Sequence, residues 1–349
     1  METPAGAVGA TASKRTITRR LTVAVAALLA AGVLGSITAA APVYTDWSAP
    51  VNLGPPVNTS IGESGPALSA DGLSLYFFSS NDLWVSRRPA PDASWGVPVN
   101  LGPTINTAAA EAFPALSTDG HWLFFASNRV GGLGGQDLYQ AYRPDVHDDL
   151  GWQTPTNLGA NVNTAGDENA AGYFENGGHP QLFFSSGPSS PFFLDLYLTD
   201  RQPDGTWGVA RLISELSTSD AEQRPSLRSD GLEIFFHSSR PGTLGGGDLW
   251  AATRPSTTAP WSTPVKLASL NTTANDIHAN ISADGKTLLW SSQRPGGLGG
   301  GDLWMATREQ VLPATKDDCK HGGWENFGVF ANQGDCVSWI ATGGKNPPG

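Results

Sequence analysis

Basic residues are scarce in this sequence. The 349-residue chain has 21 lysines and arginines against 32 aspartates and glutamates, a net charge of −11. Proteins that bind nucleic acid present a basic surface to the phosphates, and adsorption to anionic lipid needs the same sign of charge. We therefore expect no nucleic-acid partner and no attachment to an anionic membrane surface.

The sequence also lacks the usual signatures of nucleophilic, phosphate-binding and metal chemistry. It has no Gly-x-Ser-x-Gly segment and no glycine-rich loop that ends in Gly-Lys-Ser/Thr. Its six histidines are scattered, without ligand spacing to cysteine or to acidic residues. From the sequence we assign no catalytic residue, no cofactor and no metal.

Cysteine is nearly absent. Cys319 and Cys336 are the only two, and both lie near the C-terminus. Two cysteines in an exported chain most simply form one disulfide. That pairing leaves no thiol for nucleophilic catalysis.

The N-terminus has the pattern of an export signal. Four basic residues between positions 14 and 20 precede an apolar run at residues 21–37, and small residues follow up to Ala41. This order predicts a signal peptide over residues 1–41. The Arg19-Arg20 pair leaves twin-arginine export open, and the apolar run leaves an uncleaved anchor open. We expect a secreted or envelope-associated protein that has no membrane segment after cleavage.

Turn-forming residues are abundant: the chain has 42 glycines and 26 prolines, which is typical of many short strands. A unit recurs five times, and each copy starts at a tryptophan: Trp47, Trp95, Trp152, Trp207 and Trp261. Each copy continues with an acidic residue, a short apolar segment, and an Asp-Gly or Asn-Gly turn. An aromatic run such as LYFFSS or IFFHSS and a segment such as DLWAATR complete it.

These units predict the fold class. Asp-Gly and Asn-Gly are strong hairpin signals because both central positions of such a turn need positive φ. Four short strands per unit, repeated five times, predict an all-β fold, a five-bladed β-propeller. The nearly continuous apolar runs agree with strands that are covered on both faces.

The two ends of the repeat predict how the ring closes. The tryptophan segment at residues 47–53 has no third strand before it, and the segment at residues 302–308 has no tryptophan strand after it. We therefore expect the N-terminal strand to complete the last blade and remove an open edge. This divides the chain into a signal peptide (1–41), a propeller (42–310) and a small disulfide-closed C-terminal module (311–349).

The repeat resembles the WD-type β-propeller repeat of TolB-like exported proteins. The resemblance is carried over residues 47–308 by ALSADGLSLYFFS, ALSTDGHWLFFAS, LRSDGLEIFFHS and ISADGKTLLWS. It implies the fold and little about function, because propellers host many functions. The chain departs from the family in having five units, where such proteins usually have six blades, and no extra N-terminal domain.

Three copies contain a glycine-rich loop: RVGGLGGQDLY, RPGTLGGGDLW and RPGGLGGGDLW. The loop lacks the lysine of a phosphate loop, and its copies lie too far apart for a stacked calcium solenoid. We interpret the glycines as residues that allow positive φ in a long hairpin. Five repeated aspartates start the next strand, where they can accept turn N–H bonds: Asp82, Asp137, Asp195, Asp248 and Asp302. Five repeated arginines end it, and we assign them a structural role too: Arg88, Arg143, Arg201, Arg254 and Arg308.

A second set of acidic residues precedes the first strand of each unit: Glu63, Glu111, Glu168, Glu222 and Asp276. Equivalent positions in a propeller form a ring around the central channel. Five carboxylates there would attract a cation, an amine or a basic peptide. The alternative is local neutralisation by the arginines that end the second strand in three units: Arg129, Arg240 and Arg294.

Two functions follow from this sequence. We predict a monomeric, non-catalytic binding or scaffold propeller whose channel face contacts a protein or an envelope glycan. The alternative is a glycan-cleaving enzyme that uses carboxylates at the channel mouth, which requires two carboxylates in different environments. The third unit is irregular and contains Glu175 and His179, so it is either a drifted repeat or the place of a site.

The last residues, 316–349, resemble a short Cys-x-x-Gly-Gly-Trp … Gln-Gly-x-Cys module found at the ends of exported actinobacterial proteins. A segment this short buries little apolar surface, so the expected disulfide would supply much of its order. Its role is either contact with the cell envelope or a terminal cap without a partner.

Overall fold

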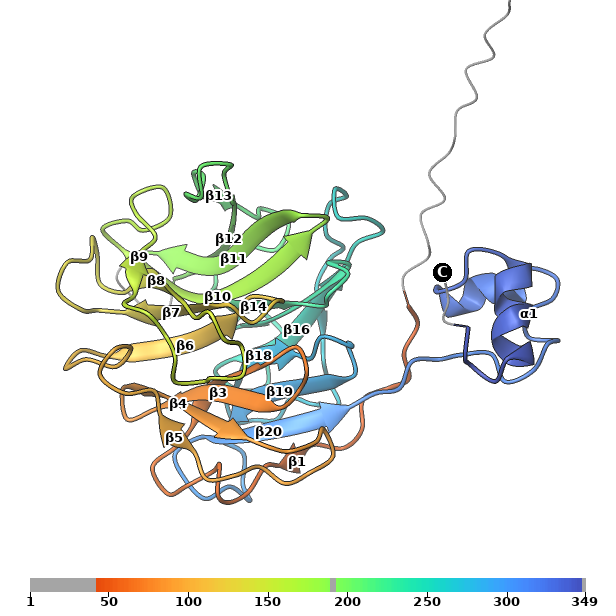
Figure 1. Cartoon of the computed structure of the whole chain (residues 1–349), viewed down its shortest axis with the longest axis horizontal. Coiled ribbons are helices and arrows are strands. Elements are labelled where there is room, and N and C mark those ends of the chain that lie inside the picture. Colours follow the sequence, from red (N-terminus) through yellow and green to blue (C-terminus); the bar gives the residue numbers. More distant parts are fainter. Residues whose placement is uncertain (1–41, 189–192, 347–349) are drawn as a thin grey trace, which may run out of the picture. The chain divides into compact units, whose positions relative to one another are not determined.

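The computed structural model describes residues 42–188 and 193–346. These residues form five antiparallel sheets of four strands each, which are arranged as blades around a channel (Figure 1). The predicted all-β, five-bladed propeller is confirmed. The predicted signal peptide lies outside the described residues.

Each blade repeats the same strand order from the channel outward. The inner strands are β2 (Ser64–Leu68), β6 (Glu111–Leu116), β10 (Asp167–Asn176), β14 (Glu222–Leu227) and β18 (Asp276–Ile281). The second strands are β3 (Ser74–Ser79), β7 (Trp122–Ser127), β11 (His179–Gly187), β15 (Glu233–Ser238) and β19 (Thr287–Ser292). The third strands are β4 (Asp82–Arg87), β8 (Asp137–Tyr142), β12 (Asp195–Asp200), β16 (Asp248–Thr253) and β20 (Asp302–Thr307). The outer strands are β5 (Val99–Asn100), β9 (Thr156–Asn157), β13 (Arg211–Leu212), β17 (Val265–Lys266) and β1 (Val51–Asn52).

The N-terminal strand closes the last blade, as the sequence predicts. In Figure 1, β1 at the red end of the colour scale lies beside β20 in blue. Val51 pairs with Met305, and Asn52 pairs with Trp304. The Asn58 side chain then bonds both the N–H and the carbonyl of Leu303, at 2.9 and 3.0 Å. The first and last parts of the propeller are thus joined by backbone and side-chain bonds.

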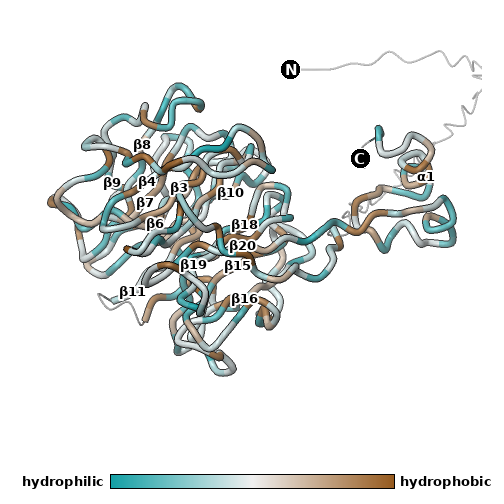
Figure 2. Tube along the Cα trace, turned by 90° about the horizontal axis from the view of Figure 1, so that it is seen from below, coloured by the Kyte–Doolittle hydropathy of each residue, from teal (hydrophilic) through white to brown (hydrophobic). Residues whose placement is uncertain are grey.

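The hydrophobic core lies between neighbouring blades. One cluster, for example, joins Tyr76 and Leu83 of the first blade to Leu123 and Phe125 of the second. The second strands are buried on both faces, which explains their continuous apolar runs. Figure 2 shows brown hydrophobic segments in the strands and teal hydrophilic ones mainly in the connections.

The five repeated arginines contact aromatic rings at the outer edge of each blade. Each guanidinium makes a cation–π contact with the tryptophan that precedes the outer strand of the same blade. The distances from guanidinium carbon to ring centre are 4.3 Å for Arg88 over Trp95, 4.5 Å for Arg143 over Trp152, 5.0 Å for Arg201 over Trp207, 4.2 Å for Arg254 over Trp261 and 4.5 Å for Arg308 over Trp47. Arg143 and Arg308 also pair with carboxylates, those of Asp149 and Glu233.

The glycine-rich loops connect second to third strands. The first glycine of each loop has a positive φ, such as 99° at Gly131. A later glycine has no room for a side chain, since a Cβ on Gly134 would lie 2.1 Å from the carbonyl oxygen of Gly166. The loops therefore need glycine both for the turn and for close approach to the next blade.

The C-terminal module has a short 3-10 helix, η1 (Gly323–Phe327), and one α-helix, α1 (Gln333–Ala341). The Asn332 side chain caps α1 by accepting a bond from the N–H of Asp335. The predicted disulfide between Cys319 and Cys336 is present, and it packs with Phe327 and Phe330. In the part of the chain that the structure describes, no helix is long and apolar enough to cross a membrane.

Removing residues 42–53 should open the fifth blade. The deletion takes away β1 and Trp47, which packs edge-on against Phe235, and leaves β20 as an exposed edge. We expect a melting temperature lower by roughly 10 °C or more, with aggregation, measured by circular dichroism and light scattering. Removing residues 316–349, which supply no strand to the five sheets, is the control. Equal melting of the two truncated chains would contradict ring closure by β1.

Candidate functional site

The five acidic residues of the predicted ring lie at equivalent places, each within one residue of the start of an inner strand. Their side chains are at most 2% exposed. Each carboxylate accepts bonds from the backbone N–H and the hydroxyl of a threonine four residues earlier. For Glu63 these distances are 2.9 and 2.6 Å from Thr59. The carboxylates thus stabilise the turn before the inner strand.

Arginines neutralise three of these carboxylates. Arg129 contacts Glu111 and Arg240 contacts Glu222, both at 3.0 Å, and Arg294 pairs with Asp276. Glu63 and Glu168 have no such partner, and burial raises the pKa of both carboxyls. A ligand-binding role for Glu63, Glu111, Glu168, Glu222 and Asp276 stays a prediction.

The repeated aspartates take part in the glycine-rich loops. Asp137 accepts bonds from the N–H groups of Leu133 and Gly134, at 2.6 and 3.0 Å, and Asp248 and Asp302 do the same in their loops. Asp82, whose blade lacks the loop, accepts a bond from Asn100. Asp195 differs, because burial and the nearby Glu222 raise its pKa and its Oδ1 has no partner.

Another ring of five residues meets across the channel. Each inner strand has a β-bulge, and one residue of each bulge has a positive φ between 54° and 61°: Gly65, Phe113, Ala170, Arg224 and His278. Phe113 and His278 have ring centres 5.0 Å apart. Arg224, from the fourth blade, reaches carbonyls of the first and second blades. Side chains of these bulges therefore fill the channel.

Arg224 is a buried cation without a carboxylate. It is 2% exposed, and its Nη2 donates to the carbonyls of Pro66 and Pro114, at 2.8 and 2.9 Å. Its Nη1 has no hydrogen-bond partner. Burial lowers the pKa of Arg224 to about 9, so the guanidinium is charged at neutral pH.

Two buried histidines accompany this arginine. Burial, with the charge of Arg224 nearby, lowers the pKa of His237 to about 3 and holds the pKa of His278 well below its usual value. His278 Nδ1 lies 2.8 Å from the hydroxyl of Ser64. Both imidazoles are therefore neutral and leave Arg224 as the charged member of the group.

A small cavity of about 90 Å³ lies at one mouth of the channel, and Arg224 lines it together with Tyr173. Tyr173 belongs to the inner hairpin of the irregular third blade. There β10 and β11 have 10 and 9 residues, whereas the corresponding strands of the other blades have 5 or 6. Tyr173 stands at the position where the other inner strands end, in Leu68, Leu116, Leu227 and Ile281, and the longer hairpin carries Glu175 beyond that point.

Tyr173 is flanked by two carboxylates. Its hydroxyl donates to Glu175 at 2.5 Å. Burial, this hydrogen bond, and the charges of Glu175 and Asp119 raise the pKa of Tyr173, while Arg201 opposes them. We call these four residues the Tyr173 site. His179, the other candidate in this blade, is exposed at the start of β11.

The Tyr173 site has an aromatic wall. Tyr173 also lines a cleft of about 120 Å³ with Trp122, Phe124, Arg201 and Trp207. These residues come from the second and third blades, so the cleft forms only when the blades pack. A tyrosine between an aromatic cleft and a polar cavity is the arrangement of a small-molecule site.

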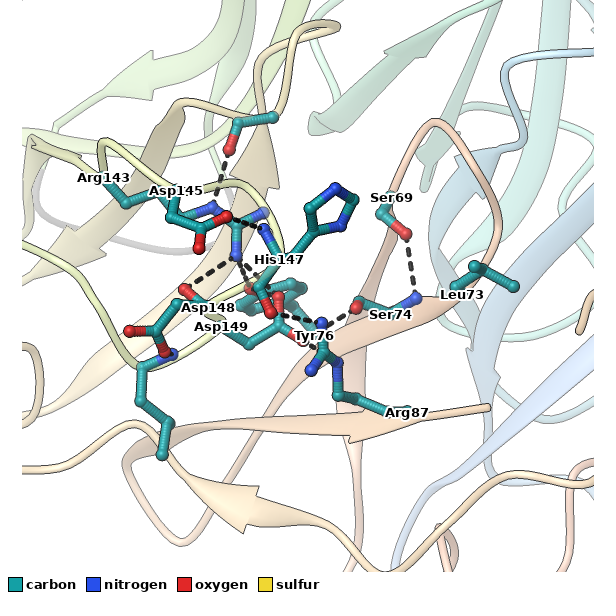
Figure 3. A network of polar contacts seen from close by, with 12 residues as sticks. Ser69, Leu73, Ser74, Tyr76, Arg87, Arg143, Asp145, His147, Asp148 and Asp149 are labelled. Carbon is teal, nitrogen blue, oxygen red and sulfur yellow. Dashed lines mark hydrogen bonds and ion pairs between the residues drawn. The ribbon is translucent and has the colours of Figure 1, made fainter. Parts of the chain in front are cut away.

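A second concentration of charge joins the first and second blades (Figure 3). Asp149 accepts bonds from Tyr76 and Arg143, both at 2.6 Å, and from Ser74 at 2.8 Å; Arg87 pairs with it at 2.6 Å. Asp149 is 4% exposed, and both of its oxygens are occupied. This network therefore stabilises the blade interface. Among the described residues, no group of three or more His, Cys, Asp or Glu side chains could hold a metal ion.

Comparison with known proteins identifies the fold. The chain matches no protein-family model and no curated protein sequence. It is similar to the catalytic domain of a GH62 alpha-L-arabinofuranosidase from Coprinopsis cinerea, with 14% identity, a TM-score of 0.52, and coverage of 77% of this chain and 98% of that one. An alpha-L-arabinofuranosidase from Lactobacillus brevis has 14% identity, a TM-score of 0.51, and coverage of 74% and 93%. A putative TolB from Agrobacterium tumefaciens has 14% identity, a TM-score of 0.43, and coverage of 72% and 91%.

These comparisons correct one prediction from the sequence. We expected a non-catalytic binding or scaffold propeller. The structural neighbours with the higher TM-scores are glycoside hydrolases, which favours the alternative, a glycan-cleaving enzyme. At 12–14% identity, these likenesses themselves show the fold, so the activity has to be argued from the site.

Two matched substitutions test the role of the acidic ring. Glu111→Gln breaks a buried ion pair with Arg129 and should destabilise the fold by about 2 kcal/mol or more. Glu63→Gln removes a buried charge that has no arginine partner, so its cost should be below about 1 kcal/mol. Urea unfolding at pH 7 measures both. A larger loss for Glu63→Gln than for Glu111→Gln would contradict this account.

The buried histidines should make the fold sensitive to acid. Their pKa values are lower in the folded than in the unfolded chain, so the unfolded chain binds more protons below its histidine pKa of about 6.5. Stability is then complete above that pH and is lost as the pH falls. Between pH 6.5 and 5, His278→Gln should reduce the loss by about 1.4 kcal/mol per pH unit. The exposed His147→Gln is the control in urea unfolding, and equal slopes in both variants would contradict the prediction.

Proposed function

We propose that this protein cleaves glycans and that the Tyr173 site is its active site. The observation that carries the proposal is the short hydrogen bond from Tyr173 to Glu175, with Asp119 and an aromatic cleft beside it. Glycan cleavage needs a nucleophile or base and a proton donor on either side of the scissile bond, and tyrosine serves as the nucleophile in some glycosidases. The fold is one that also carries glycoside hydrolase domains.

Each group has a role in the proposed reaction. Because the pKa of Tyr173 is raised, its hydroxyl attacks only when a base removes its proton, and Glu175 accepts that hydrogen bond. The Tyr173 oxygen then bonds to the anomeric carbon while the bond to the leaving sugar breaks. Asp119 is the second acidic residue, and in this proposal its carboxyl group gives a proton to the leaving oxygen. In the second step water attacks the anomeric carbon and gives a proton to Asp119, while Tyr173 leaves and regains its proton from Glu175.

The cleft supplies the binding surface. Trp122, Phe124 and Trp207 form an apolar wall, against which the C–H face of a sugar ring can pack. Arg201 lies over both tryptophans, at 5.4 and 5.0 Å from the ring centres, and donates to Gln140 at 3.0 Å. These contacts hold the wall in place between the second and third blades.

The proposal extends to where the protein works. A disulfide in a small module is typical of an oxidising compartment, and the signal pattern at residues 1–41 supports export. We propose a monomer that is secreted or held at the cell envelope, with an envelope glycan as substrate. In this proposal the Cys319–Cys336 module keeps the enzyme close to that glycan.

Two substitutions test the active site. Tyr173→Phe and Glu175→Gln should each lower kcat at least about 100-fold on any glycan that the protein hydrolyses, measured as released reducing ends across a panel of polysaccharides. Tyr197→Phe, in the same blade and outside the site, should keep full activity. Melting temperatures of all three should stay within about 2 °C of the parent protein.

The nucleophile can be identified directly. A slow fluorinated glycoside should leave a covalent adduct on Tyr173, detected by mass spectrometry of peptides, and the product should keep its anomeric configuration. Inversion of configuration would exclude Tyr173 as the nucleophile. Absence of hydrolysis across the panel, or full activity of Glu175→Gln, would overturn the proposal.

A further inference from the structure

We propose that the propeller channel binds a small monovalent anion, a halide or a carboxylate, on Arg224. The first argument is the charge of this side chain. Arg224 is 2% exposed, and its three hydrogen bonds all go to backbone carbonyls of the first two blades. Burying an ion that has no partner of opposite charge is costly. Among the described residues that contact Arg224, none is a carboxylate.

The second argument is an unused hydrogen-bond donor. Nη1 of Arg224 has no hydrogen-bond partner, although the atom is buried, and the same residue lines the cavity at the channel mouth. A charged, buried guanidinium with an unused N–H group is a strong hydrogen-bond donor to an anion. The free N–H and the uncompensated charge thus belong to one side chain.

The third argument is the lining of the cavity. No aspartate or glutamate lines it, although the whole chain has a net charge of −11. The polar residues of the wall are neutral hydrogen-bonding groups, apart from Arg224 and Arg228: Ser117, Thr118, Tyr173, Ser226, Ser229 and Asn280. An anion entering here meets hydroxyl and amide groups and no repelling carboxylate.

The charges around the cavity and its volume limit the charge and size of the ligand. Arg228 is already paired with Asp230 at 2.8 Å and with Glu233 at 2.7 Å, and His237 and His278 are neutral. The site therefore offers one uncompensated positive charge. A cavity of about 90 Å³ holds a halide or a single carboxylate group, so a divalent oxyanion would be left half neutralised.

A carboxylate bound at Arg224 can come from two kinds of molecule, which differ in how they would enter the cavity. It can be a free small carboxylate, or it can belong to an acidic sugar that enters beside Tyr173, which lines the same cavity. Binding of the anion needs Arg224 and the cavity only. It does not depend on Tyr173 acting in catalysis.

Thermal unfolding with different sodium salts at constant ionic strength tests the site. Bromide and formate should raise the melting temperature of the protein by about 3 °C or more at saturation. Sulfate stabilises folded proteins in general, so its effect should be the same in the parent protein and in Arg224→Met. Arg224→Met should abolish the rise with bromide and formate, and Arg224→Lys should keep part of it. Arg211→Met is the control, because Arg211 is an exposed arginine on the outer strand, and it should respond like the parent protein.

Three outcomes decide the proposal. A crystal grown with bromide should show an anomalous peak within about 3.5 Å of Arg224 Nη1, which needs no variant to fold. Stabilisation by glucuronate as well as formate assigns the site to acidic sugars, and stabilisation by bromide and formate without glucuronate assigns it to free small anions. An equal shift with every salt, an equal shift in Arg224→Met, or no bromide peak would overturn it. The catalytic variants do not enter this experiment, so a failed activity test and a failed anion test are separate results.

Discussion

The hydrogen bond at each blade junction positions the rest of the propeller. The backbone N–H of the acidic residue before each inner strand donates to the carbonyl that precedes the repeated aspartate of the previous blade, at 2.7–2.9 Å in all five cases. The carboxylate of the same residue binds a threonine four residues earlier, for example Glu111 with Thr107. One residue therefore fixes both its own turn and the neighbouring blade. The residue two positions later is then the bulge residue that reaches the channel, which is how Glu222 places Arg224.

Local sequence signals predicted the fold well, because turns and repeated apolar runs are local properties. The closing pair of β1 and β20 followed from counting strands per unit. The channel residues could not be predicted in the same way. In a regular strand, side chains two residues apart share a face, so Glu222 and Arg224 would both point to the channel. The bulge at Arg224, with its φ of 58°, breaks that period. One sequence signal was available for this residue. The fourth unit has an arginine at the position where the other units have Gly, Phe, Ala and His.

In the third blade the repeat pattern no longer predicts which residues form the site. The irregular sequence of this blade predicted a candidate site that contains Glu175, but it gave no reason to include Tyr173. Trp122 and Trp207 line the cleft beside Tyr173. Trp122 belongs to the second blade and Trp207 to the outer segment of the third, so the cleft forms only after the blades pack. Asp195 is a further consequence of irregularity, because the outer strand β13 presents Leu212 where three other blades have an asparagine. Asp195 also lacks the glycine-loop N–H that bonds Oδ1 of Asp137, Asp248 and Asp302, and its own Oδ1 is buried without a bond.

Opposite charges meet at one mouth of the channel, and this separates the tasks of the two sites. Tyr173 donates a hydrogen bond to Glu175, has its pKa raised by the nearby charge of Asp119, and lines the cavity of Arg224. Arg224 is buried, whereas Glu175 and Asp119 are exposed, so water screens the carboxylates more than the guanidinium. The electric field near Tyr173 points from Arg224 toward the carboxylates. In the proposed arrangement, an acidic sugar would bind with its negative group toward Arg224 and its neutral part along the aromatic wall. His237 and His278 are neutral, so Arg224 is the only positive charge of this group. Protonation of either histidine would add positive charge beside Arg224.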